Sequence, residues 1–302
     1  VRFSRRSRDE SDGGAGPRAF AFPHFASSQI SFLGMIRLFA WFTASLGALL
    51  CLYPFLWMFL SSFKTNREIY EPTLLFPQSY EWGAFASLLN GEYLAFFQSF
   101  GNSLVLSGGQ AFLATMVSAG AGFALAKFRF RWAGVFFFLA LMLIIFPKQS
   151  LAVSMFEWLG ILGWQGSLWS LMLPGAVTGL GVVFFLQLFR NLPDEWLEIA
   201  RIEGLSAWRT FQLLVPLAFP GLVTFFLLHF VLSWQEHLLP LLALDEESMT
   251  LPLALTKLRD ASFRIPEAVS MAAATLSILP VALMFAVCFR LMKSALREVT
   301  HS

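Results

Sequence analysis

The residues of this chain that could do chemistry are polar side chains placed inside long apolar segments. Such groups are costly in an apolar environment unless they hydrogen-bond to one another or line a polar path. Neutral hydrogen-bonding groups beside abundant Trp and Phe suit the hydroxyls and ring faces of a sugar or polyol, but each could equally be an interhelical hydrogen bond. The candidates for a substrate path are Asn102, Gln110, Thr178, Gln187, His229, Ser233, Gln235 and Glu236.

Motifs of the common enzyme classes do not occur in the sequence. It contains no Gly-x-x-x-x-Gly-Lys-Ser/Thr loop for nucleotide phosphates, no His-Glu-x-x-His zinc motif and no Gly-x-Ser-x-Gly elbow. Cys51 and Cys288 both lie in apolar runs, which argues against a disulfide framework or a cysteine-based metal site. His229 and His237 are either a ligand pair on one helix face or histidines that line an interface or pore. We expect no catalytic residue, no metal and no bound cofactor.

The elements that must position these residues are membrane spans. Of the 302 residues, 57% are hydrophobic and 13% are charged, and the mean hydropathy is +0.66. Soluble domains carry about 25% charged residues, so this composition excludes an ordinary soluble enzyme, a disordered chain and a nucleic-acid-binding protein. The lipid bilayer is the expected solvent. A span needs roughly 20 apolar residues, and the expected spans are 38–62, 100–126, 133–156, 168–189, 217–240 and 268–291.

Positive charge predicts the orientation of these spans, because cytoplasmic loops are enriched in Lys and Arg. Most of the 21 such residues lie at the two ends of the chain and in the loops after the second and fourth spans. Both termini are therefore expected in the cytoplasm. Pro147 interrupts the third span and predicts a kink there.

Residues 1–34 differ in composition from the rest, with Arg5-Arg6, Asp9-Glu10 and Gly13-Gly14 but little periodicity. We expect this segment to be disordered, ahead of a six-span domain over 35–302. A twin-arginine signal is the alternative, but polar residues follow the arginine pair where an apolar core belongs. Met35 stands directly before the first span and is a candidate translation start.

The longest expected cytoplasmic loop, 190–216, predicts two helices joined by a tight turn. Asn191-Leu192-Pro193-Asp194-Glu195 is typical of a helix start, and Trp196, Ile199 and Ala200 then fall on one face. Gly204 favours a left-handed turn, and Ser206 is a suitable cap for a second helix that leads into the fifth span. Taken alone, the pattern predicts an interfacial helix pair.

The same residues resemble a known family. Glu198-Ile199-Ala200-Arg201-Ile202-Glu203-Gly204-Leu205, with Pro216 after it, is similar to the EAA loop of ATP-binding-cassette (ABC) importer permeases, although Ile199, Glu203 and Leu205 depart from that pattern. The interval from Gly204 to Pro216 is also shorter, and the Gly-rich tail of the family is missing after residue 293. Further similarities, over about 35–295, are to the carbohydrate-type, maltose-permease G-like subgroup: Asn102-Ser103, Ser233-Trp234-Gln235-Glu236, Thr250-Leu251-Pro252-Leu253 and Leu279-Pro280.

The resemblance implies an all-α membrane protein with the type I importer permease fold, in the bacterial inner membrane. It implies that Glu198, Ala200, Glu203 and Gly204 belong to a coupling helix that docks on a separate ATPase, so that ATP is used by a partner. The implied assembly adds a second permease subunit, two ATPase subunits and an extracytoplasmic solute-binding protein that delivers a sugar or polyol. The alternative is an ion-coupled secondary transporter, a class that often has repeated halves and intramembrane acids.

Overall fold

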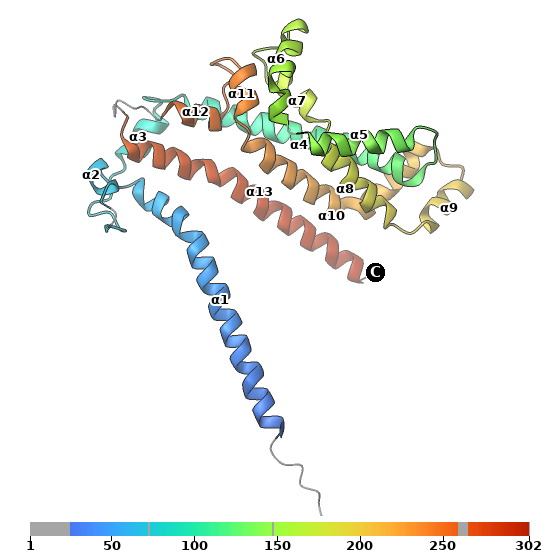
Figure 1. Ribbon diagram of the computed structural model, residues 1–302, viewed down its shortest axis with the longest axis horizontal. Helices are drawn as coiled ribbons and strands as arrows, with labels where there is room; N and C mark the ends of the chain where they lie inside the picture. The colour runs from blue at the N-terminus through green and yellow to red at the C-terminus, as the bar shows by residue number, and fades with distance from the viewer. Residues whose placement is uncertain (1–24, 72, 147, 259–264, 302) are drawn as a thin grey trace, which may run out of the picture. The chain divides into compact units, whose positions relative to one another are not determined.

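The computed structural model describes residues 25–71, 73–146, 148–258 and 265–301, and within these every regular element is a helix (Figure 1). The chain divides into two compact units, residues 1–54 and 55–302. The helices are α1 (Phe25–Ser61), α2 (Asn66–Ile69), α3 (Gly83–Leu89), α4 (Phe96–Lys127), α5 (Ala133–Ile145), the 3-10 helix η1 (Lys148–Leu151), α6 (Ala152–Ile161), α7 (Trp169–Gly175), α8 (Gly179–Arg190), α9 (Glu195–Ile202), α10 (Ala207–Trp234), α11 (Leu238–Ala243), α12 (Leu251–Lys257) and α13 (Glu267–His301).

The first unit contains most of α1, which is apolar enough to cross a membrane over Arg37–Ser61. This helix begins at Phe25, ahead of the boundary expected at residue 35. The rest of the segment expected to be disordered, residues 1–24, lies outside the described residues, as do Arg5-Arg6 and Asp9-Glu10.

Four helices are each long and apolar enough to cross a membrane, namely α1, α4, α10 and α13. The expected third span, 133–156, is instead α5 followed by η1 and α6 after a bend of 94°. A proline cannot continue the helical hydrogen-bond ladder, and Pro147, itself outside the described residues, falls at this break. The expected fourth span, 168–189, is α7 and α8 with a 42° bend between them. The structure thus provides up to six crossings, with two of them bent.

The core of the second unit forms where α4 approaches α8 and α10. A Cβ built on Gly122 of α4 would lie 2.5 Å from the Phe185 Cβ of α8, so the two backbones are in near contact. Aromatic rings fill the space beside this contact: the Phe123 and Phe211 centroids are 5.2 Å apart, and those of Phe185 and Phe225 are 5.1 Å apart. Inside a membrane the hydrophobic effect does not drive helices together, so their association depends on close packing, which small residues such as glycine allow.

Helix α10 unites the expected second loop helix and the fifth span in one element, despite Pro216 and Pro220. It ends at Trp234, earlier than the expected boundary at 240. Glu236 and His237 therefore lie outside the helix, and the expectation that His229 and His237 share a helix face is wrong. The Glu236 carboxylate explains this end: its Oε1 accepts hydrogen bonds from the backbone N–H groups of His237 and Leu238, both at 3.1 Å, at the start of α11.

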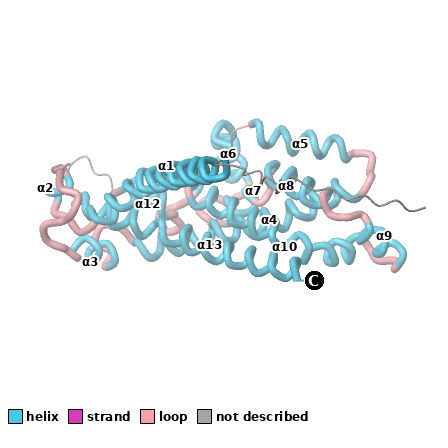
Figure 2. Tube along the Cα trace, turned by 90° about the horizontal axis from the view of Figure 1, so that it is seen from below, coloured by secondary structure: helices cyan, strands magenta, loops and turns pink. Residues whose placement is uncertain are grey.

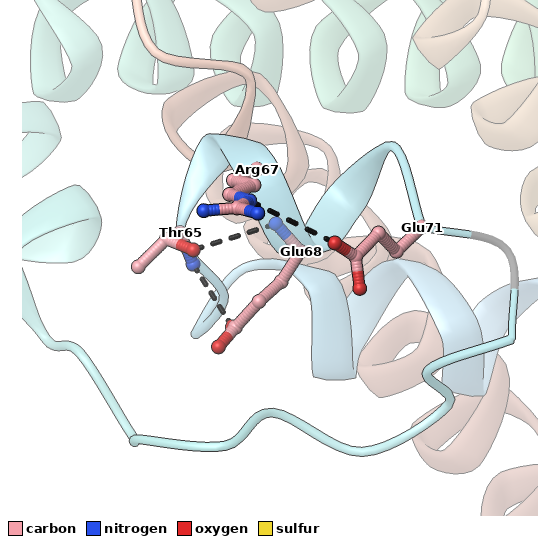
Figure 3. Close-up of polar contacts among 4 residues, drawn as sticks. All are labelled: Thr65, Arg67, Glu68 and Glu71. Atoms are coloured by element: carbon pink, nitrogen blue, oxygen red, sulfur yellow. Dashed lines mark hydrogen bonds and ion pairs between the residues drawn. The ribbon is translucent and has the colours of Figure 1, made fainter.

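The two ends of the second unit are built differently. Figures 1 and 2 show α9 at one end of the long helices, with α3 and α12 toward the other. At the α3 and α12 end, α2 begins with a capping box, drawn in Figure 3. Glu68 N–H donates to the Thr65 hydroxyl at 3.4 Å, and Thr65 N–H donates to Glu68 Oε2 at 3.2 Å. This reciprocal pair satisfies two backbone donors that a helix start leaves free.

Candidate functional site

The predicted helix, glycine turn and second helix in the 190–216 loop are confirmed. Helix α9 spans Glu195–Ile202, Gly204 has a φ of +65°, and the Ser206 hydroxyl accepts a hydrogen bond from Arg209 N–H at the start of α10. A φ in the left-handed region costs other residues about 1–2 kcal/mol. Nothing lies within 4 Å of a Cβ built on Gly204, so in this chain the glycine serves the backbone conformation alone.

The inward face of α9 consists of Leu197 and Ala200, which are 8% and 1% exposed. The sequence grouped Trp196, Ile199 and Ala200 on one helix face, and of these three the structure buries only Ala200. Trp196 and Ile199 are exposed, and Ile202 is 84% exposed. Leu197 and Ala200 are one helical turn apart, so both lie on the face of α9 that is turned toward the rest of the protein. The outward face of α9 thus presents large apolar side chains.

Of the four residues assigned to coupling, three are accessible and one is not. Glu198, Glu203 and Gly204 are exposed, whereas Ala200 is buried within this chain. Ala200 also anchors the turn, because its carbonyl accepts a hydrogen bond from Leu205 N–H at 2.9 Å. Ala200 therefore supports the shape of the loop rather than presenting a surface.

The start of α9 is fastened to the end of α4 by an ion pair that the sequence did not predict. Lys127 Nζ lies 2.5 Å from Asp194 Oδ1 and 2.9 Å from the Leu192 carbonyl oxygen, and the Lys127 side chain is 3% exposed. Hydrogen bonding to Lys127 and its charge lower the pKa of the Asp194 carboxyl below its ordinary value. The only feature of the sequence that pointed to this ion pair is that Lys127 stands at the end of a predicted span. Basic residues in such places predicted only the orientation of the spans.

A hollow of about 630 Å³ opens beside this ion pair, between the ends of α4 and α8 and the side of α9. It is lined by four basic and two acidic residues: Lys127, Arg129, Arg190, Arg201, Asp194 and Glu198. Apart from the Lys127–Asp194 pair, none of them forms an ion pair with a described side chain. Together with Lys127, the charge of Arg201 across this hollow lowers the pKa of the Asp194 carboxyl.

Among the substrate-path candidates, Gln110 and Ser233 meet between α4 and α10. The Ser233 hydroxyl donates to Gln110 Oε1, and Gln110 Nε2 donates to the Leu171 carbonyl oxygen of α7 at 3.1 Å. A Cβ on Gly175 would collide with the Gln110 amide, so this glycine makes room for it. One glutamine thus connects three helices.

His229 lies on α10 one turn before Ser233. Its side chain is buried, its ring stacks on Phe225 with centroids 5.8 Å apart, and its Nε2 has no hydrogen-bond partner among the described residues. Thr178 is also buried, at the N-cap position of α8, but its hydroxyl makes no capping bond. A buried imidazole nitrogen without a partner is costly, and such a group marks a place where a ligand or water would be favoured.

Asn102 lies elsewhere, in the N-terminal half of α4. Its side-chain amide donates to the carbonyl oxygens of Glu247 and Met249, at 2.9 and 3.1 Å. The neighbouring Ser103 hydroxyl accepts from Leu251 N–H at 2.7 Å, at the start of α12. The Asn-Ser and Thr-Leu-Pro segments noted in the sequence therefore bind each other, and Asn102 positions the loop before α12.

The remaining candidates do not join this cluster. Gln187 and Gln235 are exposed, the latter just beyond the end of α10, and Glu236 accepts a hydrogen bond from Leu238 N–H at the start of α11. The structure brings together Gln110 and Ser233, with His229 on the adjacent turn of α10.

These features define a class of protein: a multi-pass helical membrane subunit that presents an apolar-faced helix outside its spans. Residues 96–298 match the family described as "Binding-protein-dependent transport system inner membrane component", and the chain belongs to that family. Its helices form the type I permease fold of ABC importers, and the chain is an inner-membrane transport permease rather than an enzyme.

Individual relatives agree with this assignment. The chain is 30% identical over 261 residues to the inner membrane ABC transporter permease protein YcjP of Escherichia coli (strain K12), covering 83% of this chain and 91% of that protein. It is 30% identical to the arabinooligosaccharides transport system permease protein AraQ of Halalkalibacterium halodurans, covering 70% and 77%. A chain of a bacterial ABC transporter involved in the import of the acidic polysaccharide alginate has the same fold, with a TM-score of 0.73, 20% identity and coverage of 89% and 98%.

Proposed function

We propose that this chain is the permease subunit of an ATP-driven importer and that α9 is the helix through which a separate ATPase drives it. The observation that carries the proposal is the outward face of α9, with Ile202 84% exposed next to the acids Glu198 and Glu203. A helix outside the spans does not leave such side chains in water without cause, because exposed apolar patches rimmed by polar residues mark interaction sites.

In this proposal the α9 end of the molecule and both termini face the cytoplasm, where ATP is available. Closure of two ATPase subunits on ATP displaces α9, and the displacement rocks the spans between inward-facing and outward-facing states. A second permease subunit completes the path, and an extracytoplasmic binding protein delivers the substrate to the opposite end. The family description supports the binding protein, and the placement of Lys and Arg supports the orientation.

The proposed substrate is a sugar or a related polyol. The relative AraQ is named for arabinooligosaccharide transport, and UgpE of Yersinia pestis, 29% identical over 210 residues, is named for sn-glycerol 3-phosphate transport. Gln110, Ser233 and His229 offer hydrogen-bond donors and acceptors between α4 and α10, which suit the hydroxyl groups of a sugar or polyol. We propose that Thr178 and Gln110 line the same path, while Asn102 and Gln235 contribute near its outer end.

Photo-cross-linking tests the docking role of α9. A photoreactive benzoylphenylalanine at Ile202 is expected to cross-link, in the source cells, to a subunit that carries a nucleotide-binding Gly-x-x-x-x-Gly-Lys-Ser/Thr loop. The same residue placed at Tyr80, which is exposed near the other end of the second unit, is the matched control and is expected to give no such product. Failure to capture an ATPase from Ile202, Ile199 and Glu203 alike would contradict the proposal.

A further inference from the structure

Lys127 differs from the other cations in ion pairs between described residues. Its side chain is 3% exposed, whereas Lys257 and Arg67, in the pairs with Glu246 and Glu71, are 52% and 91% exposed. A buried ammonium is tolerated only when its hydrogen bonds are satisfied. Both hydrogen bonds that Lys127 Nζ donates to described residues go to the segment that leads into α9, namely to Asp194 and the Leu192 carbonyl.

The ion pair joins the end of α4 to the start of α9, which are far apart in the sequence. Lys127 is the last residue of α4, and Asp194 stands directly before α9, with the whole of α5 to α8 between them in sequence. Helix α8 is already fixed to α4 by the contact of Gly122 with Phe185. The start of α9 is therefore held to two packed helices, while its other end turns at Gly204 into α10.

Lys127, which holds the start of α9, lies on the same helix as two further polar contacts, and that helix is α4. These contacts are made by Gln110, which hydrogen-bonds to α7 and α10, and by Ser103, which hydrogen-bonds to the start of α12. Gln110, Ser103 and Lys127 all lie on α4, which is one helix from Phe96 to Lys127, so a displacement of the whole helix reaches both contacts. Lys127 thus supplies the hydrogen bonds and the ion pair that join the end of α4 to the connection before α9.

We propose that Lys127 is a positioning residue for transport: by holding Asp194 and the Leu192 carbonyl, it makes α4 follow the displacement of α9. This inference rests on the proposed function, in which an ATPase moves α9. It adds that the force enters the spans at the end of α4 as well as through the covalent connection to α10.

The test is the number of ATP molecules hydrolysed per molecule imported, measured in proteoliposomes that contain the complete importer with its co-purified partners. The probes are radiolabelled arabinotriose and sn-glycerol 3-phosphate. Lys127→Met and Asp194→Asn are each expected to raise the ratio at least about fivefold, the lower end of typical couplings between sites. Lys127→Arg is expected to stay near wild type, because it keeps the charge. The matched control Lys257→Met removes an exposed ion pair and is expected to leave the ratio unchanged.

The outcomes separate the two proposals. If the wild-type complex imports neither probe in response to ATP, both the proposed function and this inference fall. If the wild-type complex couples import to ATP and both Lys127→Met and Asp194→Asn keep its ratio, only the role of Lys127 is contradicted. Should Lys127→Met fail to assemble, Asp194→Asn decides, because the Asp194 side chain is 77% exposed and its replacement leaves the packing intact.

Discussion

Gly122 of α4 lies so close to Phe185 of α8 that a Cβ on the glycine would be 2.5 Å from the Phe185 Cβ and 2.6 Å from the Leu186 backbone nitrogen. The neighbouring atoms are backbone or the first atom of a side chain, so they cannot rotate away. The packing of α4 on α8, which supports the start of α9, therefore requires a glycine at this position.

Gly122→Ala is expected to lower the stability of the protein by about 1–3 kcal/mol, the usual cost of overpacking. Gly120→Ala is the matched control on the same helix, because nothing lies within 4 Å of its Cβ. Alanine in a helix is favoured over glycine by roughly 0.5–1 kcal/mol, so Gly120→Ala should be neutral or stabilising. Thermal unfolding in detergent measures both, and equal stabilities of the two variants would argue against the close contact.

Gly204→Trp is expected to abolish ATP-dependent uptake while the protein remains in the membrane at normal levels. The indole would project from the turn into open space in this chain, where the proposed partner must fit. Gly204→Asn is the control, since asparagine tolerates the left-handed conformation and is small. Uptake and membrane content are measured together. Normal uptake by the Trp variant would count against docking at this loop.

The Lys127–Asp194 ion pair gives the attachment of α9 a defined pH dependence. The pKa of Asp194 is lowered from its ordinary value of 3.8 by the hydrogen bond and charge of Lys127. A carboxyl whose pKa is lower in the folded protein than in the unfolded chain stabilises the fold at pH values above its unfolded-state pKa. This stabilisation is lost as the pH falls through the folded-state pKa. Hydrogen exchange of α9 amides, corrected for intrinsic rates, should therefore stay constant from pH 8 to about 5 and rise only below about 4. A loss of protection centred near neutral pH would contradict this assignment.

The Ser233–Gln110 hydrogen bond is expected to contribute modestly to stability. Interhelical hydrogen bonds in membranes average about 0.6 kcal/mol and reach about 1.7 kcal/mol at most. A double-mutant cycle with Ser233→Ala and Gln110→Leu should give a coupling energy in that range. If the two substitutions have fully additive effects on unfolding, the contact between α4 and α10 is not present in the membrane.

The sequence predicted the elements better than their contacts. Span positions follow from composition and length, and the Gly204 turn and Ser206 cap follow from local backbone chemistry, so each was predictable from a few neighbouring residues. The kink expected at Pro147 falls at the observed break between α5 and η1, but the size of that bend, 94°, and the 42° bend between α7 and α8 were not predicted from the sequence.

Contacts between distant segments could not be read from one sequence. The Lys127–Asp194 pair, the Gln110–Ser233 pair and the inward position of Leu197 depend on how α4, α8 and α10 pack. Periodicity grouped Trp196 with Ala200 on one face of α9 but did not indicate which face the protein covers, because this short helix has apolar residues on two faces.

Reconstitution tests the central claim most directly. Uptake of arabinotriose and sn-glycerol 3-phosphate is measured in proteoliposomes that contain either this chain alone or this chain with its second permease, ATPase and binding-protein partners, with and without ATP. The account predicts uptake of at least one probe only by the complete assembly with ATP. Uptake by this chain alone, driven by an ion gradient and indifferent to ATP, would contradict it.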